Sequence, residues 1–488
     1  MGKNKPLPPR SFLDPLIIFY YDSGKSDKES LDLIVRYHLD TTTYGLGYSS
    51  FRKIRRSMDL LGTRQQAHTL ESIQDQMQEL RVLFPNAGML EMKSHLFDRY
   101  RMKVARSIIE SFFATFEPEL RQARLGRKLV RMQFWAAGIN VLWCFDQHDK
   151  WKYKFGLCFH VGVDPFSGYL LWLRVWWNNS NPQLICSYYL DTVEGLGYIP
   201  LMTQSDPGTE NTRIADAQTH LRQLLDPQLA GSIQHNWKRK KTNVKAEIEW
   251  SQFRRRWAPG FENILERGVV AGHYDLSNPI QVLLFRCLAI PWLQGELDRY
   301  RQRVNNFKPR KNVHKLTPHG RRQDLHFRPQ DFGARDFKVL VPPQDVALAR
   351  ETYIDAGHSV FQLVPPTFAE VVNIIYVAMG QPPVSEKNFW SVYCDVLDQI
   401  EAGIEAETIP HAVVREWAEG VVRAVQEDDQ AQRQAEVEEA QGAPNLFADP
   451  SRPPQGFVVV NNGGEGLPTV QLTDDEDESD GEAWLVDP

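Results

Sequence analysis

Three segments rich in aromatic and β-branched residues follow one another with short connections. They cover residues 141–147, 155–163 and 169–177, and the connections are 148–154 and 164–168. Residues of these types favour β-strands, and connections this short join strands that run antiparallel. The sequence therefore predicts a three-stranded antiparallel meander, which restricts the fold to those that begin a sheet in this way.

Helical and extended patterns alternate after the meander. Helices are predicted at 182–196, 211–225 and 244–257, and extended segments at 199–205 and near Ile233. A three-stranded meander followed by alternating helices and strands is the order of the ribonuclease H-like fold. We therefore predict an α/β class of fold with a ribonuclease H-like core at 138–265.

Helical patterns with helix-start signals precede this core. Ser26 and Glu29 have the spacing of a capping box, and the glycine-containing turn 44–47 separates that helix from one beginning near Ser49. A second, similar set of helices begins with Thr69 as its cap. Paired short helices with a basic second member are typical of helix-turn-helix DNA-binding units. The alternative is a small helical domain whose charged face only contacts solvent.

Basic side chains accompany these helices. Those on the second helix lie away from its apolar stripe, and a further group follows Pro118 as a basic connector. Next to candidate helix-turn-helix units, phosphate contact is the favoured interpretation. The predicted DNA-contacting residues of this region are Arg52, Lys53, Arg55, Arg56, Arg124, Arg127 and Lys128.

At 488 residues the chain is too long for one ordinary domain. A helix predicted at 278–303, interrupted at Pro291, lies in a helical extension of the core. The predicted regions are a basic leader (1–25), a helix-turn-helix unit (26–66), a second such unit (67–120), a basic linker (121–137), the core (138–265), its helical extension (266–335), an α-rich C-terminal region (336–425) and a disordered acidic tail (426–488).

Charge is distributed unevenly along the chain. The net charge is −6, but residues 426–488 contain 16 acidic and 2 basic side chains and carry −14. The rest of the chain therefore carries +8, which suits a protein that binds a polyanion. The basic N-terminus has no apolar segment typical of a secretory signal, the longest apolar stretch (280–293) is too short for a bilayer, and the five cysteines have no CxxC spacing. We expect a soluble intracellular protein.

Three acidic residues occupy positions suited to metal-dependent phosphoryl transfer. Asp146 ends the first predicted strand, Asp206 ends the strand at 199–205, and Glu247 lies on the helix 244–257, with spacings of 60 and 41 residues. An acid within an apolar strand is costly unless a cation or hydrogen bonds offset it. Mg²⁺ and Mn²⁺ take carboxylate oxygens, and transfer to and from DNA uses two such ions.

The motifs around these acids resemble those of a known enzyme group. Trp143-x-x-Asp146 with the glycine-rich segment 156–172, Gln204-Ser-Asp-Pro-Gly-Thr-Glu210 and Asn243-x-x-x-Glu247-x-x-Trp250 are similar to the signatures of retroviral-type integrases and DDE transposases. More specifically, the chain resembles fungal integrase-core-domain proteins, near Ginger-type transposases, over about 30–335. It lacks the His/Cys zinc-binding domain that precedes retroviral cores, and no SH3-like or chromo module is evident after the core.

The resemblance implies roles for individual residues and for the chain. Asp146, Asp206 and Glu247 would be the catalytic metal ligands for Mg²⁺ or Mn²⁺ in a two-metal site, and Arg254 and Arg255 would contact DNA. The implied activity is DNA 3′-end cleavage and strand transfer on double-stranded DNA, by a polynucleotidyl transferase acting in the nucleus as a homo-oligomer, with no membrane and no small-molecule substrate.

Neighbouring acids are alternatives to the three. Asp149 competes with Asp146, and Glu249 lies about 200° around the helix from Glu247, so only one of that pair can face the site. Asp164 fits a turn before Pro165, and Glu210 is a further candidate. His148, Lys150 and His235 are near the acids in sequence. They are candidates for phosphate contact, and ordinary surface placement is the alternative.

Two other functions remain open from the sequence. The chain could be a transposon-derived DNA-binding or chromatin-associated protein that kept the fold without the reaction. It could also be a structure-specific nuclease built on the same core.

Overall fold

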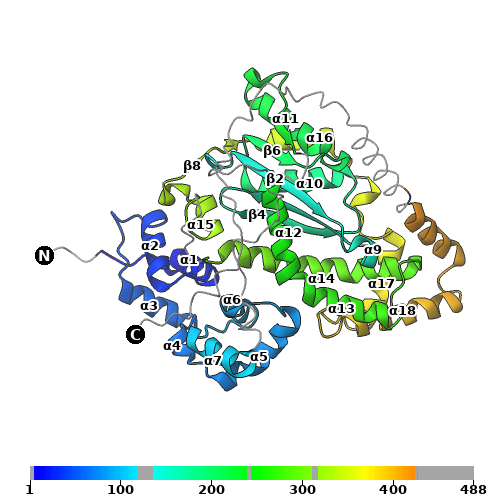
Figure 1. The fold of residues 1–488 in the computed structure, drawn as a ribbon, viewed down its shortest axis with the longest axis horizontal. Coiled ribbons are helices and arrows are strands. Elements are labelled where there is room, and N and C mark those ends of the chain that lie inside the picture. Colours follow the sequence, from blue (N-terminus) through cyan, green and yellow to red (C-terminus); the bar gives the residue numbers. More distant parts are fainter. Residues whose placement is uncertain (1–4, 119–135, 239–242, 310–316, 424–425, 427–488) are drawn as a thin grey trace, which may run out of the picture. The chain divides into compact units, whose positions relative to one another are not determined.

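The computed structural model describes residues 5–118, 136–238, 243–309, 317–423 and 426 (Figure 1). They form two compact units, one containing residues 5–118 and 306–308 and the other containing the remaining described residues. Each unit is described by itself. The predicted basic linker, with Arg124, Arg127 and Lys128, and the predicted acidic tail lie outside the described residues, apart from 136, 137 and 426.

The first unit is helical. The capping box predicted at Ser26 is present, since Glu29 N–H donates to Ser26 Oγ and Ser26 N–H donates to the Glu29 carboxylate. Thr69 likewise caps its helix by accepting from Ser72 N–H. The helices are α1 (Arg10–Asp22), α2 (Asp27–Tyr37), α3 (Tyr48–Ser57), α4 (Thr63–Gln66), α5 (Leu70–Leu83), α6 (Met89–Tyr100) and α7 (Arg106–Phe116).

Helix α1 lies within the region predicted to be a basic leader, so that prediction is corrected for residues 10–22. Leu13, Ile17 and Tyr20 recur at helical spacing and are buried together with residues of α2 and α3. This apolar stripe is a helix signal, but the lysines, arginines and prolines around it conceal it in the composition. Helices α1, α2 and α3 therefore form one small three-helix core.

The second unit is a mixed α/β structure around a five-stranded sheet, which agrees with the predicted α/β class. The strand order is β4-β3-β2-β6-β7, with β3 antiparallel to β2 and β4, and with β2, β6 and β7 parallel. The predicted meander is β2, β3 and β4. The strands are β1 (Gly138–Ile139), β2 (Leu142–His148), β3 (Cys158–Asp164), β4 (Tyr169–Trp176), β5 (Tyr198–Ile199), β6 (Met202–Ser205), β7 (His235–Trp237), β8 (Arg335–Asp336) and β9 (Val339–Leu340).

Helices cover both faces of this sheet. Figure 1 shows α10, α11 and α16 grouped on one side and α12 crossing the other. The helices and short 3₁₀ segments are α9 (Lys152–Phe155), α10 (Pro182–Leu196), η1 (Thr209–Asn211), α11 (Thr212–Leu225), η2 (Pro227–Leu229), α12 (Val244–Arg256), α13 (Ala258–Val270), α14 (Pro279–Asn306), α15 (Arg322–Phe327), η3 (Pro329–Phe332), α16 (Pro343–Tyr353), η4 (Ser359–Phe361), α17 (Pro366–Ala378) and α18 (Phe389–Glu405); residues 411–423 are also helical.

The strand predicted at 199–205 is divided in two. Tyr198 and Ile199 pair with β9, whereas Met202 to Ser205 pair with β2 and β7. Pro200 lies between the two pieces and has no N–H to give to a ladder. The division therefore follows from the proline.

Helix α14 runs through Pro291, so the predicted interruption there is wrong. Pro291 is exposed, and the carbonyl that loses its intrahelical partner can be hydrated. The helix is also fixed to the outer edge of β4 by polar side chains: Gln294 accepts from Val175 N–H and donates to Leu173 O, and Asn305 does the same with Leu170. These contacts protect an edge strand from pairing with another chain.

The sheet's hydrophobic core extends into the region predicted to be a separate α-rich segment. Val341, Val346, Ala349 and Val360 are buried in the same cluster as residues of β2, α10 and α11. The core of this unit therefore uses residues from well beyond 265.

One described segment, Ser359–Ala378, has the mean hydropathy (1.4) and length of a membrane-spanning helix, with 22% buried. The segment includes η4 and a break at Pro365, so α17 itself has 13 residues. That helix is about 20 Å long, short of the ~30 Å hydrocarbon core of a bilayer.

Candidate active site

Strand β2 presents alternate side chains to two different environments. Trp143 and Phe145 are buried in the cluster with α10 and α11. His148 stacks on Trp250 of α12, with 5.1 Å between ring centroids. Because side chains alternate across a strand, Asp146 faces the same side as His148, toward α12. It is partly exposed, and its Oδ1 accepts from Gln147 N–H at 3.0 Å.

Asp206 lies one residue beyond the adjacent parallel strand, β6. The register pairs Cys144 with Gln204, so Asp146 and Asp206 are the next same-facing positions along the two strands. Parallel strands lie about 4.8 Å apart, and their carboxyl ends open at one edge of the sheet. The local sequence thus places two aspartates side by side at that edge.

Glu247 and Glu249 on α12 have different environments. Glu249 is buried and its Oε2 pairs with Arg322 Nη1 at 2.8 Å, with both side chains 8% exposed. Glu247 is partly exposed, and its charge acts on Asp146. This arrangement supports Glu247 as the residue that faces the acids.

The acids influence one another's ionisation. Burial and the negative charges of Asp206, Glu247 and Asp149, in that order, raise the pKa of Asp146 well above its usual value, against the Gln147 N–H bond. Burial, with Asp149 and Asp206, raises the pKa of Glu210 to about 7. These five residues, which we call the acidic cluster, therefore form one electrostatic unit.

Glu210 is the member of the acidic cluster that the sequence left as a minor candidate. It is buried, and Asn211 Nδ2 donates to its Oε1 at 2.7 Å. Its carboxylate lies against Gly208, where any Cβ would collide with it. Gly208 therefore leaves room for the carboxylate of Glu210, four residues after Asp206, to lie against the turn. The four-residue spacing between Asp206 and Glu210 was the sequence signal for Glu210.

Asp149 also remains in the acidic cluster. Asn179 Nδ2 donates to its Oδ1, and its charge raises the pKa of both Asp146 and Glu210. Its influence on Asp146 is smaller than that of Asp206 or Glu247.

The donor types of the acidic cluster suit a hard cation. Carboxylate oxygens are what Mg²⁺ and Mn²⁺ take, and acids that raise one another's pKa are stabilised by positive charge. Among the described residues, however, no group of three or more His, Cys, Asp or Glu side chains is spaced to hold a metal ion. The chemistry of the donors fits the metal, and their coordination geometry is not formed.

Asp164 has the environment of a structural turn residue. It is fully buried; its Oδ1 accepts from Phe166 N–H, Ser167 N–H and Ser167 Oγ at 2.9–3.0 Å, and its Oδ2 accepts from Asn140 N–H. These bonds fix the turn between β3 and β4. This agrees with the turn role that the sequence favoured.

The four basic residues predicted to contact DNA on α3 do not share one environment. Arg55 is 3% exposed, its Nε is 2.9 Å from Asp27 Oδ1, and its Nη2 donates to Gln65. We therefore correct its assignment: it holds α3 to α2 and α4 and does not reach the surface. Arg52 is partly exposed near Asp27, and Lys53 and Arg56 are exposed.

The basic end of α12 lies beside the acid-bearing strand. Arg254 is exposed, and its charge, after burial, helps lower the pKa of His148 to about 4. Arg255 is only partly exposed. Lys238 and Lys245, which sequence reasoning missed, act electrostatically on buried Cys144 behind the acidic cluster. The only sequence signal for these two lysines was their position, directly after β7 for Lys238 and at the start of α12 for Lys245.

His235 is not placed to contact phosphate. It is buried between Thr203 and Ser205, whose hydroxyls lie 2.8 Å and 3.1 Å from its two ring nitrogens, and burial lowers its pKa to about 3. It joins β7 to β6. Lys150 is exposed.

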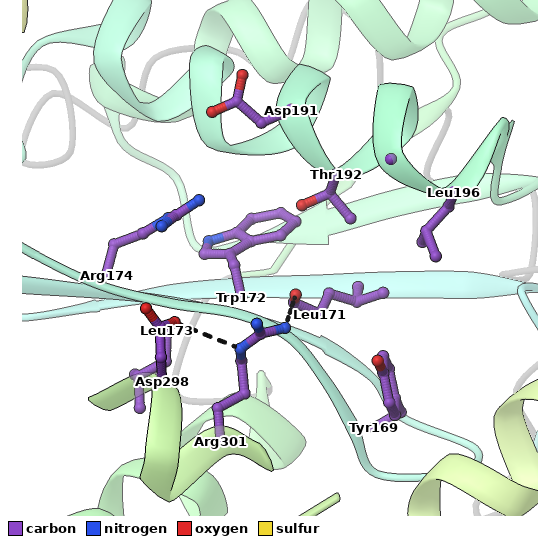
Figure 2. Close-up of a pocket in the computed structure, with 11 residues that line it drawn as sticks. Tyr169, Leu171, Trp172, Leu173, Arg174, Asp191, Thr192, Leu196, Asp298 and Arg301 are labelled. Carbon is purple, nitrogen blue, oxygen red and sulfur yellow. Dashed lines mark hydrogen bonds and ion pairs between the residues drawn. The ribbon is translucent and has the colours of Figure 1, made fainter. Parts of the chain in front are cut away.

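A cavity of about 270 Å³ lies elsewhere in the same unit, at the β4 edge of the sheet. Figure 2 shows Trp172 and Arg174 of β4 facing Asp191 and Thr192 of α10, with Arg301 of α14 donating to Leu171 O. The charges of two arginines and two aspartates in the cavity wall cancel. No residue of the acidic cluster is in that wall. It is separate from the candidate active site.

A comparison with known families finds a match mainly within this unit. Residues 134–321 match the family model described as integrase core domain. The matched segment contains β2, β6 and α12 with their three acids, and it supports an integrase-core-domain protein whose general function is DNA integrase-like or transposase-like polynucleotidyl transfer. It covers less than half of the chain. No curated protein matches the chain.

Proposed function

We propose that this chain is a metal-dependent DNA integrase or transposase of the DDE type, with a ribonuclease H-like core, that cleaves DNA 3′ ends and joins them to target DNA. The observation that carries the proposal is the convergence of charge at Asp146, where Asp206 and Glu247 raise its pKa from two other elements. The integrase core match over the same residues supports it.

Each acid has a proposed role as an oxygen donor. Asp146, Asp206 and Glu247 would hold Mg²⁺ or Mn²⁺, which when bound supplies positive charge to the attacking and leaving oxygens. Water attacks the phosphodiester at the element end, and the bond to the leaving 3′ oxygen breaks. The freed 3′-hydroxyl then attacks a target phosphodiester, so that one bond forms as another breaks. Arg254, which is exposed, would contact DNA phosphate beside the acids.

The proposal includes the setting of the protein. Its partners would be double-stranded DNA and further copies of itself on DNA, and it would act in the nucleus. Its motifs favour a relationship to fungal integrase-core proteins near Ginger-type transposases.

A supercoiled-plasmid assay with the full chain, a labelled linear donor DNA and Mn²⁺ tests the function. Covalent transfer of the donor into the plasmid is the expected result. Nicking without transfer would instead identify a nuclease, and binding without either would identify a DNA-binding protein that lacks the reaction.

DNA binding by the first unit gives a second prediction. The α1–α3 core would act as a helix-turn-helix unit with α3 as its basic helix, on which Lys53 and Arg56 are exposed. Changing both to Glu turns their attraction to phosphate into repulsion. With screening by salt, we take the net change as about 1 kcal/mol for each residue. We expect duplex affinity to fall roughly tenfold to a hundredfold at 0.1 M salt, with a shallower salt dependence, measured by fluorescence anisotropy.

The matched control is Arg415→Glu with Arg423→Glu. These two residues are exposed in the helical segment 411–423, and the net charge changes equally. Equal loss of affinity in both variants would mean that net charge, and not α3, governs binding. Arg55→Glu should instead lower the melting temperature, because Arg55 is buried against Asp27.

A further inference from the structure

Asn243 occupies the N-cap of the helix that carries Glu247, but its side chain does not cap that helix. Asparagine is favoured at this position because its side-chain oxygen accepts from the first free N–H groups of the helix. Here the side chain is completely buried and is directed to other elements. A buried amide diverted from its usual bond needs a separate explanation.

The Asn243 amide joins the two acid-bearing strands. Its Nδ2 donates to Phe145 O at 2.6 Å, and its Oδ1 accepts from Gln204 Nε2 at 3.2 Å. Phe145 directly precedes Asp146, and Gln204 lies two residues before Asp206 on the same face of β6. One side chain therefore connects β2, β6 and α12.

Gln204 extends the connection across the sheet. Its Oε1 accepts from Asn236 Nδ2 of β7 at 3.3 Å, and its Nε2 also lies 3.6 Å from Cys144 Sγ. The β2–β6 register ends at Cys144 and Gln204, so the Phe145 carbonyl lies just past the ladder and accepts from the Asn243 side chain there. The Asn243 side-chain bonds therefore lie at the end of the regular β2–β6 ladder, next in sequence to Asp146 and two residues from Asp206.

We infer that Asn243, with Gln204, is a positioning residue that holds together the three elements carrying Asp146, Asp206 and Glu247, so that these acids can be drawn around a bound metal ion. This inference rests on the proposed function. Three carboxylates repel one another, so their elements must be held together by bonds that do not depend on the acids themselves. Buried amide bonds at zero exposure are directional and are not weakened by solvent. Partners that orient metal-binding groups commonly change metal affinity by about 10- to 100-fold when removed.

The test measures Mn²⁺ binding directly, by electron paramagnetic resonance titration of the full chain, together with strand transfer and thermal melting. Asn243→Ala should raise the Kd for Mn²⁺ about tenfold or more and shift the Mn²⁺ dependence of strand transfer to higher concentration. Gln204→Met removes the bonds that join Asn243 to β6 and β6 to β7 while keeping the side-chain volume, and it serves if Asn243→Ala does not fold.

The matched control is Gln218→Ala. Gln218 of α11 is also fully buried, donates from Nε2 to Pro200 O at 3.0 Å and accepts from Tyr189 Oη. It belongs to the opposite face of the sheet, so its removal should lower the melting temperature while leaving the Kd for Mn²⁺ within about twofold of wild type.

The outcomes separate the inference from the function. Folded Asn243→Ala or Gln204→Met protein that binds Mn²⁺ as wild type does would overturn the positioning role while leaving the integrase function intact. A wild-type chain that binds Mn²⁺ at a saturable site weakened by Asn243→Ala, but never joins DNA, would overturn the function and support the positioning role. No saturable Mn²⁺ binding by the wild type would overturn both.

Discussion

Asp206→Asn is expected to abolish strand transfer while leaving the fold intact. The change keeps the shape of the side chain but removes one negative charge from the carboxylates that meet at Asp146. Loss of one preorganised electrostatic group commonly costs a factor of about 10²–10³ in rate, and a direct metal donor should cost at least as much. Strand transfer and Mn²⁺ affinity should fall together, and DNA binding through α3 should stay near the wild-type value.

The same variant should be as stable as the wild type, or more so, above the usual pKa of an aspartate. The Asp206 charge helps raise the folded-state pKa of Asp146, so ionising Asp146 at neutral pH costs folding free energy. Removing that charge relieves part of the cost. The gain should shrink as the pH falls through the raised pKa of Asp146, because the wild-type carboxyl then takes up a proton; urea denaturation at several pH values measures this.

Asp164→Asn is the control, and it should lose stability while it keeps strand transfer. An amide cannot accept all the bonds that Asp164 receives from the backbone of its turn, so stability should drop by about 1–3 kcal/mol. Joining per folded molecule should persist well below the melting temperature. If Asp164→Asn abolished joining while Asp206→Asn spared it, the active site would be placed at the wrong acid.

The sequence predicted most of the sheet and its helices because periodicity and turns are local properties. The helix at 182–196 has the predicted bounds, and the meander differs from its predicted segments only near the ends. Two of the places that the sequence misjudged depend on tertiary contacts. Pro291 stays helical because α14 is bonded along β4, and α1 is helical because Leu13 and Ile17 pack on α2 and α3.

The positions of two candidate acids could be predicted from the sequence, and the residues around them could not. Asp146 lies in, and Asp206 directly follows, a strand that can be recognised from the sequence, so their neighbouring positions follow from a parallel register. The burial of Arg55 does not follow in this way, since a helical pattern places it off the apolar stripe but cannot show that Asp27 covers it. The role of Asn243 is hidden for the same reason, because its partners lie 39 and 98 residues away.

Variants of Glu247 and Glu249, which lie on one turn of α12, should separate loss of activity from loss of stability. Glu249 and Arg322 form a buried ion pair, and Arg322 Nη1 also donates to Gly168 O at 2.7 Å, which ties α12 to the β3–β4 turn and α15. Removing one partner of a buried pair commonly costs about 3–5 kcal/mol, because a buried charge loses its counter-charge. Arg322→Met should therefore lower the free energy of unfolding by about 3 kcal/mol, and the double variant Arg322→Met with Glu249→Leu should recover much of that loss.

Glu247→Gln should show the opposite pattern on the same helix. Glu247 is partly exposed and its charge helps raise the pKa of Asp146, so its neutralisation should leave urea stability unchanged or slightly higher while joining is lost. Glu249→Gln should lower stability and keep joining per folded molecule, because its carboxylate is directed to Arg322. Urea denaturation and the plasmid assay on the two variants side by side decide the assignment. Normal joining by Glu247→Gln, with loss of joining in stably folded Glu249→Gln, would move the third metal ligand to Glu249 and require α12 to turn by about 200° from the orientation that its bond to Arg322 now fixes.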